Sequence, residues 1–519
     1  MHSFAAKIKS YFGAVNLREG KEWKVLLRFS LPIVLSYLLQ QIYTVSDAVI
    51  CGQTLSADEV AGVNDVFPLT FIFLQFAFGC TAGFSVITST RVGNSDAAGV
   101  RRSFASQIVL SAIITAVLTA LSIATLPAML GVINLSPANG EVYRAAYEYC
   151  FVIFCGIFAQ MFYNFVCSVL RSIGDSATPL LFLFISTVLN VALDLLFIMA
   201  FGWGVIGAAA ATVLAQGLST VACFIYTFAK YPELRLHKED FRRVKGEYFA
   251  HLRQGLPLGL QFSVLAVGII VMQGTLVAFD VTASGQMVAG NPAQNGFGAA
   301  TKLNNFMMSP LNALGTAMVS FNAQNYGAGQ YDRIKRGMKQ SLVMMLVLFV
   351  ALAGTGLLLT VDNAYLKLFL SADKITAESV RFGNHYLFVD FGLYFALGAL
   401  FVMRGGVQGI GKSSFVLLAG AAELTARVLV CIFLPVLANG APITSEASEL
   451  AYLMLCAADP AAWFAAVAAL AYPTIRYMLR GKCPSPSATF AKKLFYRPRR
   501  METAAATATE ELPEVKKRA

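Results

Sequence analysis

The sequence is poor in charged residues. Asp, Glu, Lys and Arg make up 13% of its 519 residues, whereas hydrophobic residues make up 57%. Soluble domains carry about 25% charged residues, so the composition excludes an ordinary soluble protein. Residues for metal or acid–base chemistry are also scarce, because the four histidines are scattered and the nine cysteines form neither a CxxC pair nor a paired framework. These absences argue against an enzyme and against a resident cofactor.

Long apolar stretches are abundant instead. A segment of about 20 apolar residues is enough to cross a bilayer, and twelve such segments occur. We therefore expect an all-α polytopic membrane protein with twelve transmembrane helices. In the last segment, Asp459 and Pro460 interrupt an alanine-rich run. The expected spans lie near residues 28–50, 60–90, 104–130, 145–170, 178–200, 203–229, 252–279, 296–322, 338–360, 384–408, 413–438 and 450–478.

The basic residues indicate how the chain is oriented. The net charge is +11, and the positive residues gather at the N-terminus, in alternate loops and in the C-terminal tail. The other loops hold only a few of them: Arg144, Lys367, Lys374 and Arg381. By the positive-inside rule, both termini of this multi-pass plasma-membrane protein are expected to be cytoplasmic. The charge thus reports membrane topology and does not indicate a nucleic-acid partner.

Three short motifs occur twice, once in each half of the chain, with offsets of 225, 234 and 237 positions. The growing offset places an insertion in the outer loop around 281–295. Six spans per copy is an even number, so both copies keep one orientation and should be related by a pseudo-two-fold axis along the membrane normal. The pairs are Leu31-Pro32 with Leu256-Pro257, Gly93-Asn94-Ser95-Asp96 with Gly327-Ala328-Gly329-Gln330, and Ile173-Gly174-Asp175-Ser176 with Ile410-Gly411-Lys412-Ser413.

These features divide the chain into five parts. Residues at the start have no long hydrophobic region or cleavage site, so they are expected to be retained as an amphipathic segment and not removed as a signal peptide. The parts are the cytoplasmic N-terminal segment 1–27, the N-lobe 28–229, a cytoplasmic linker 230–251, the C-lobe 252–478 and a basic, disordered cytoplasmic tail 479–519.

A carboxylate lies inside the first span. A charged Asp at the centre of a membrane helix costs about 2.5–3.5 kcal/mol on insertion scales. Asp47 continues a stripe of polar residues on one helix face, formed with Ser36, Gln40 and Tyr43 at helical spacing. Such a stripe faces water, another helix or a solute. It indicates a cation or proton site with a polar cavity wall; a structural hydrogen-bond network between helices is the alternative.

A second acid lies at a similar depth. Asn190 and Asp194 are one turn apart in the fifth span, and Thr212 reaches a comparable level in the sixth. The repeat offsets place Met272 at the position of Asp47 and Cys431 at that of Asp194, so the second half lacks both acids. This asymmetry favours an ion site in the N-lobe. Oxygen ligands suit Na⁺ and closely spaced acids suit H⁺, and the sequence leaves both open.

Other intramembrane charges have structural explanations available. Lys302 lies inside the eighth span and is expected to face the cavity near Asp390, as a substrate contact or as a structural pair. Glu423 and Arg427 are four residues apart on one helix and are expected to neutralise each other; a direct role in transport is the alternative.

Taken together, three motifs resemble those of the multidrug and toxic compound extrusion (MATE) family, over about residues 28–478. They are Pro32 with Gln40-Gln41-Ile42-Tyr43 and Asp47, the segment Arg171-Ser172-Ile173-Gly174-Asp175-Ser176, and the segment Gln324-Asn325-Tyr326-Gly327-Ala328-Gly329. The resemblance implies a two-lobe transporter, expected to be a monomer in contact with membrane lipids, that exports organic cations or drugs by alternating access in exchange for Na⁺ or H⁺.

The resemblance also assigns roles within the N-lobe. It implies a coupling-cation site at Asp47, Asn190, Asp194 and Thr212, a cavity lined by Tyr43 and Tyr149, and a helix hinge at Pro32.

Another branch of the family carries an acidic cation site in its C-lobe. The corresponding stretches here, around Ser263 and Leu397, have no acid, and Asp390 lies about two turns farther out. The main rival function is a flippase for a lipid-linked or polysaccharide precursor. Its phosphate-bearing substrates would require a cationic cavity. Lys302 and Arg427 could supply such charge, so the flippase remains the alternative function.

Overall fold

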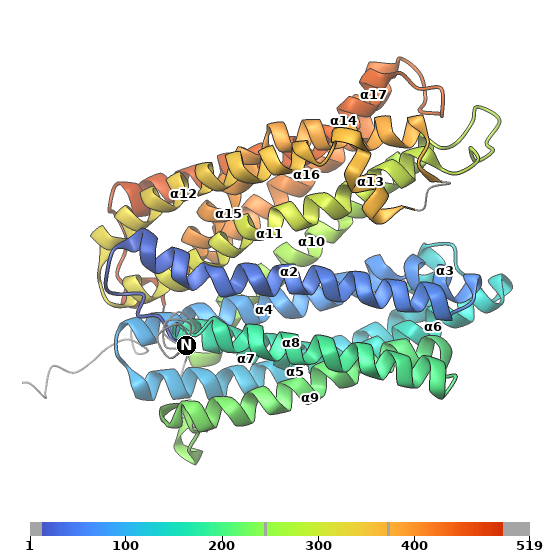
Figure 1. The fold of residues 1–519 in the computed structure, drawn as a ribbon. Helices are drawn as coiled ribbons and strands as arrows, with labels where there is room; N and C mark the ends of the chain where they lie inside the picture. Colours follow the sequence, from blue (N-terminus) through green and yellow to red (C-terminus); the bar gives the residue numbers. More distant parts are fainter. Residues whose placement is uncertain (1–12, 243–245, 371–373, 491–519) are drawn as a thin grey trace, which may run out of the picture.

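The computed structural model describes residues 13–242, 246–370 and 374–490, and within these ranges nearly every element is a helix (Figure 1). Nine helices there are long and apolar enough to cross a membrane, and eleven segments are if each of two bent pairs forms one span. The more polar α11 (Pro292–Gly327) occupies the place of the eighth predicted span. The all-α polytopic prediction is confirmed, and the twelve-span layout fits.

The first half of the chain forms the helices α2 to α9. The predicted fourth span is a pair of helices bent by 44° at Gly156, and the fifth ends in a π-helix directly after Asp194. The elements are α2 (Glu22–Thr54), α3 (Ala57–Asp65), α4 (Phe67–Gly93), α5 (Ala97–Val132), η1 (Pro137–Asn139), α6 (Glu141–Cys155), α7 (Ile157–Ser172), α8 (Ala177–Asp194), the π-helix η2 (Leu195–Ala200), α9 (Gly204–Lys230), η3 (Pro232–Leu234) and η4 (Lys238–Phe241).

The second half repeats this pattern. The tenth span is again a bent pair, here at 53°, and the twelfth is broken at Ala457, next to the Asp459-Pro460 interruption. The elements are α10 (Glu247–Ala278), α11, α12 (Tyr331–Leu358), η5 (Val361–Asn363), α13 (Ala364–Phe369), α14 (Ala377–Gly392), α15 (Tyr394–Gly409), α16 (Ser413–Asn439), α17 (Glu449–Cys456), α18 (Ala458–Pro473), the π-helix η7 (Thr474–Leu479) and α19 (Pro486–Thr489).

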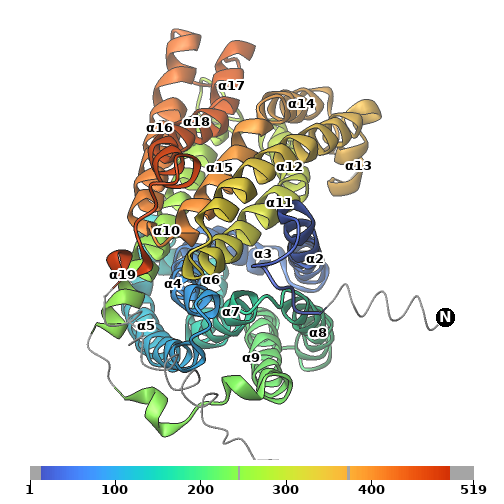
Figure 2. The same cartoon turned by 90° about the vertical axis from the view of Figure 1, so that its left-hand side faces the viewer.

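The two halves form two helix bundles that lie side by side. In Figure 2 the bundle of α2–α9 and the bundle of α10–α18 are seen separately, one below the other. Contacts between them run mainly through α4 against α10 and α11 against α2, with α4 also crossing α11. Because α10 and α11 are the repeat equivalents of α2 and α4, these two packings are equivalent, as a pseudo-two-fold relation requires. Figure 1 shows the bundles diverging toward the end that carries α3, α6 and α17.

The opposite end is held together by backbone contact between α4 and α11. A Cβ added at Gly93 would lie 1.9 Å from the carbonyl oxygen of Gln324, and one added at Gly327 would lie 1.9 Å from that of Thr90. Only glycine permits such an approach. Gly93 and Gly327 are also partners in the sequence repeat. We call this region, residues 90–96 and 324–330, the closed end; the sequence predicts it to be cytoplasmic.

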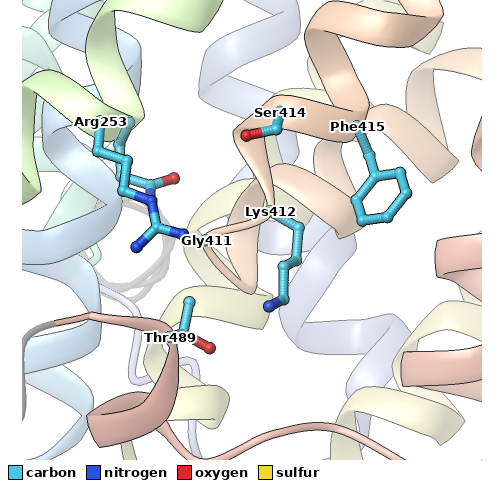
Figure 3. Close-up of a pocket in the computed structure, with 7 residues that line it drawn as sticks. Arg253, Gly411, Lys412, Ser414, Phe415 and Thr489 are labelled. Atoms are coloured by element: carbon cyan, nitrogen blue, oxygen red, sulfur yellow. The ribbon is translucent and has the colours of Figure 1, made fainter.

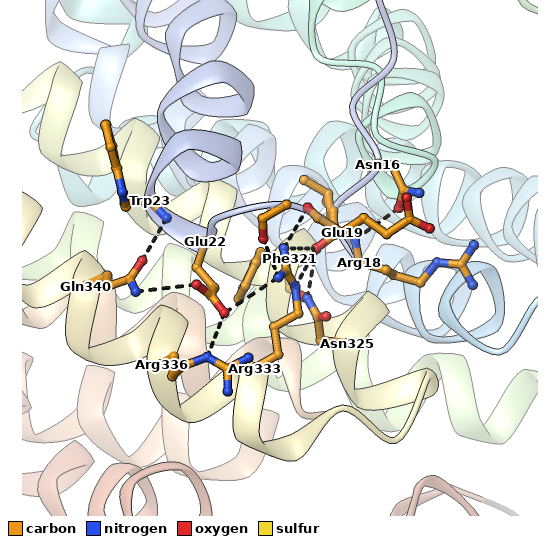
Figure 4. A network of polar contacts seen from close by, with 12 residues as sticks. Asn16, Arg18, Glu19, Glu22, Trp23, Phe321, Asn325, Arg333, Arg336 and Gln340 are labelled. Atoms are coloured by element: carbon orange, nitrogen blue, oxygen red, sulfur yellow. Dashed lines mark hydrogen bonds and ion pairs between the residues drawn. The ribbon is translucent and has the colours of Figure 1, made fainter.

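The chain before α2 bridges both bundles at the closed end (Figure 4). Arg333 on α12 donates to the backbone carbonyls of Leu17, Glu19 and Gly20. Toward the first bundle, Arg18 donates to the carbonyl of Gly93 at 3.1 Å. Residues 13–21 therefore connect the two lobes by hydrogen bonds at the closed end. Of the predicted segment 1–27, residues 1–12 lie outside the described residues.

The start of the predicted C-terminal tail is packed on the second bundle. Tyr326 donates to the carbonyl of Pro484 at 2.7 Å, and its hydroxyl also lies 2.5 Å from that of Thr489 in the short helix α19. Residues 480–490 thus continue the folded part, whereas 491–519 lie outside the described residues.

Candidate functional site: an oxygen-rich cluster in the first lobe

Three helices bring predicted site residues together. Tyr43 on α2 donates to the hydroxyl oxygen of Thr212 on α9 at 3.2 Å. Asn190 on α8 donates to the same oxygen at 3.4 Å. These residues are distant in sequence, and their prediction as a group rested on their depth in the membrane and on the family resemblance. Thr212 is the point at which α2, α8 and α9 converge.

Asp194 lies at this point as the last residue of α8. Its side chain is fully buried, and neither carboxylate oxygen has a hydrogen-bond donor among the described residues. The side-chain oxygen of Asn190 is likewise buried and unsatisfied. Burying an ionised carboxylate without partners is very costly. The π-helix that begins at Leu195 changes the backbone pitch directly after it, and such bulges occur often at functional sites.

Asp47 adds a second carboxylate from α2. It is half-buried, and its Oδ1 has no donor among the described residues. Its charge interacts electrostatically with Asp194 and with Tyr43, Cys51 and Tyr149. Two negative charges in a medium of low dielectric constant repel each other. A cation or proton bound between them would remove that repulsion and satisfy the unpaired oxygens.

The remaining predicted residues of the first lobe lie on α6 and along α2. Tyr149 on α6 is half-buried against the core of α4–α7. Gln40 is exposed, one turn from Tyr43 on α2. Pro32 is buried within α2, and the hydroxyl of Ser36 donates to its carbonyl at 2.8 Å. Proline removes one helical hydrogen bond, so α2 has a weak point between the closed end and Asp47.

Lys302 and Asp390 do not form the predicted pair. Asp390 is fully buried and accepts a hydrogen bond from Asn304 at 2.8 Å. Lys302 is exposed, and its ammonium lies 5.9 Å from the ring centroid of Phe369. They do not pair because Asn304, two residues after Lys302 on α11, is the buried residue that reaches Asp390, whereas Lys302 is exposed.

The second lobe contains a paired charge network. The predicted Glu423–Arg427 pair is present, at 3.8 Å. Each residue has a closer partner, however: Arg404 on α15 pairs with Glu423, and Arg427 pairs with Asp459 on α18 at 2.8 Å. The sequence interpretation missed the roles of Arg404 and Asp459. Their position inside apolar spans was the available signal, because intramembrane charges require partners.

The buried carboxylates of the two lobes therefore differ in the partners that compensate their charge. In the second lobe Glu423 and Asp459 pair with arginines, and Tyr386 also donates to Asp459 at 3.2 Å. Asp390 accepts from Asn304 at one oxygen, while its Oδ1 has no donor among the described residues. In the first lobe Asp194 has no protein donor among the described residues. Because both oxygens of Asp194 are unsatisfied, the first lobe is the candidate location of a cation site.

Comparisons with known proteins agree with this architecture. The sequence model of the MatE family matches residues 32–196 and 271–433, once in each half of the chain. The chain is 29% identical over 407 residues to the probable multidrug resistance protein YpnP of Bacillus subtilis, covering 77% of this chain and 85% of the relative. It is 25% identical over 330 residues to a FAD transporter of Shewanella oneidensis, covering 62% and 70%.

Solved structures show the same fold. The outward-facing conformation of a multidrug resistance MATE family transporter of the MOP superfamily superposes with a TM-score of 0.76 at 20% identity. The match covers 90% of this chain and 99% of that chain. The two-lobe, twelve-span arrangement is therefore shared along the whole membrane region.

Proposed function

Since the chain belongs to the MatE family, whose members are membrane transporters and not enzymes, we propose that it exports organic cations or drugs in exchange for Na⁺ or H⁺. It acts as a monomer in the plasma membrane with both termini in the cytoplasm. Asp47, Asn190, Asp194 and Thr212 form the coupling-cation site, and Gln40, Tyr43 and Tyr149 line the adjacent cavity.

One observation carries this proposal: Asp194 is fully buried with both carboxylate oxygens unsatisfied. A purely structural acid would be expected to have donors, as Glu423 and Asp459 of the second lobe have. Asp194 instead lies among the oxygens of Asn190, Thr212 and Asp47, which are ligands suited to Na⁺; a proton on either carboxylate would serve equally. The cation couples to export because its arrival removes the negative charge that holds an organic cation.

The hinge in α2 connects this site to the opening of the lobes. α2 contacts the cation site through Tyr43 and the second lobe through Tyr37, whose hydroxyl lies 2.9 Å from that of Thr316 on α11. Cation binding between Asp47 and Asp194 draws the outer part of α2 toward α8. Bending at Pro32 then changes its packing on α11, one of the contacts between the lobes that must rearrange for access to alternate.

The test is transport by the purified protein in liposomes. Dye efflux is driven separately by a Na⁺ gradient and by a pH gradient, which identifies the coupling ion. Asp47→Asn and Asp194→Asn are expected to abolish gradient-driven efflux, because each removes a charge while keeping shape and hydrogen-bonding capacity. Asp65→Asn, at an exposed acid of the same lobe, is the matched control. Asp390→Asn is expected to be milder, and efflux lost in Asp390→Asn but retained in Asp47→Asn would refute the N-lobe assignment.

A flippase for a lipid-linked or polysaccharide precursor is the second candidate. Lys302 favours it, because this exposed lysine has no carboxylate partner among the described residues and would suit a phosphate-bearing substrate. The FAD transporter shows that a relative carries an anionic molecule. Against it, Arg404 and Arg427 are already paired. Lys302→Gln would impair translocation of an anionic substrate while sparing efflux of a cationic dye.

A further inference from the structure

A cavity of about 170 Å³ lies beside the N-terminus of α16, near the closed end of the second lobe (Figure 3). In Figure 3 the side chains of Arg253, Lys412 and Thr489 surround one common space. Three parts of the chain meet there: α10, the turn before α16, and α19. The lining residues are Arg253, Gln254, Gly411, Lys412, Ser414, Phe415 and Thr489.

The two cations at this cavity have no acidic partner. Within residues 13–242, 246–370 and 374–490, neither Arg253 nor Lys412 forms an ion pair, and the ammonium of Lys412 instead lies 5.4 Å from the ring centroid of Tyr477. Partial burial, together with the nearby guanidinium of Arg253, lowers the pKa of Lys412. Two like charges that face one cavity repel each other, so an anion between them would be stabilised by both.

Neutral donors face the same space. Gln254 is only 2% exposed, and its amide oxygen accepts a hydrogen bond from Ser413 at 2.5 Å. Its amide nitrogen has no acceptor among the described residues, although the residue lines the cavity. α16 is 27 residues long and has no side-chain cap at Lys412. The N–H of Phe415 donates to the carbonyl of Lys412 at 3.0 Å. The N–H groups of Ser413 and Ser414 have no such partner among the described residues and carry the positive end of the helix dipole.

The sequence repeat shows what this position holds in the other lobe. The equivalent of Lys412 is Asp175, whose carboxylate accepts from the backbone N–H of Thr178 at 3.0 Å and so caps α8. The same carboxylate binds Lys230 at 2.9 Å and the hydroxyl of Tyr231 at 2.7 Å. The first lobe thus has a built-in anion at the start of its helix. The second lobe has replaced that carboxylate with a cation and left a cavity in its place.

We propose that this cavity binds the phosphate group of a ligand, which occupies the role that the Asp175 carboxylate has in the first lobe. Arg253 and Lys412 supply charge-assisted hydrogen bonds, and Gln254, Ser414 and the first N–H groups of α16 complete the donors. The phosphate belongs either to an anionic lipid headgroup or to a soluble phosphate compound. Its binding also holds Thr489, and with it the segment that follows η7, against the bundle.

Thermal unfolding of the purified full-length chain tests this site, followed with a thiol-reactive dye because seven of the nine cysteines are buried. In phosphate-free detergent, sodium phosphate is compared with sodium chloride at equal ionic strength. In nanodiscs, phosphatidylglycerol is compared with phosphatidylcholine. A saturable rise in Tm with phosphate in detergent identifies a soluble phosphate ligand, and a rise with phosphatidylglycerol only identifies a lipid headgroup.

Variants decide whether the rise comes from this cavity. Arg253→Gln and Lys412→Ala are expected to weaken the apparent affinity about tenfold or more, the effect of losing one charged hydrogen bond. Lys412→Asp restores the arrangement of the first lobe, so it should raise the basal Tm and abolish the response. Lys339→Ala, at an exposed lysine of α12, should respond as the wild type does. No rise with either probe, or an equal rise in all variants, would overturn the proposal.

Discussion

At the residue scale, two buried aspartates of the first lobe differ in whether the protein supplies hydrogen-bond donors to their carboxylates. Asp175 and Asp194 are both fully buried. Asp175 accepts hydrogen bonds from Thr178, Lys230 and Tyr231, whereas Asp194 has no donor among the described residues. The first arrangement stabilises the fold, and the second leaves the carboxylate that we propose is compensated by a cation or proton.

Asp175 is expected to contribute pH-dependent stability. Burial alone would raise its pKa, but the hydrogen bonds from Thr178, Lys230 and Tyr231 outweigh burial and hold the pKa below its ordinary value. A depressed pKa means that the contribution is present above the unfolded value of about 3.9 and is lost as the pH falls through the folded value. Asp175→Ala should therefore cost about 2–4 kcal/mol at neutral pH.

The measurement is Tm against pH for both proteins. The difference between wild type and Asp175→Ala should stay constant above about pH 5 and shrink below about pH 4, as the native carboxylate becomes protonated. A difference that persists unchanged into acid would mean that packing, and not charge, accounts for the effect.

At the element scale, the crossing of α4 and α11 determines how closely the lobes meet. Each helix presents a glycine to the backbone of the other, at Gly93 and Gly327. Nearby, Gly79 and Gly83 of α4 pack in the same way against the backbone of α10. Glycine in a helix is normally unfavourable by roughly 0.5–1 kcal/mol relative to alanine. Its repeated presence in α4 is explained by the close backbone contacts that this helix makes with α10 and α11.

Gly93→Ala should separate the lobes at the closed end, because the added methyl group meets the carbonyl of Gln324. Overpacking of this kind costs about 1–3 kcal/mol, so Tm and transport should both fall. Gly298→Ala, on α11 where a Cβ meets open space, should leave both unchanged or raise Tm slightly. Equal behaviour of the two variants would show that the crossing does not require glycine.

At the scale of the whole molecule, the helices separate two sets of loops by the length of the bundle. α2 alone has 33 residues, or roughly 50 Å at 1.5 Å per residue. The closed end holds the motif loops 94–96 and 328–330, and the other end holds α3, η1 and α17 (Figure 1). In the proposed transport cycle, access to the candidate cation site alternates between these two ends.

Cysteine labelling should fix the orientation. In a cysteine-free background in intact cells, cysteines introduced at Ser56, Asn139 or Thr444 should react with a membrane-impermeant reagent. Those at Ser95 or Glu239, on loops rich in basic residues, should react only after permeabilisation. Reaction at Ser95 in intact cells would reverse the assigned orientation.

Coupling between cation and substrate should be visible without a gradient. If both compete for the first lobe, their binding is linked reciprocally, so raising Na⁺ or lowering the pH should weaken binding of a cationic substrate in detergent. In Asp47→Asn this antagonism should largely disappear even where some binding survives. A substrate affinity that does not change with Na⁺ concentration or with pH would favour the flippase.

The amino-acid sequence by itself determined the membrane class, the number of spans, the internal repeat and the candidate acids Asp47 and Asp194. These features are readable because a bilayer imposes a local rule on length and polarity, and a charge that violates the rule stands out. The tertiary structure decided which charges are neutralised: Arg404 pairs with Glu423 and Arg427 with Asp459, whereas Asp194 keeps no protein donor among the described residues. Pairing depends on how separate helices rotate and pack against one another, and no local pattern encodes that rotation.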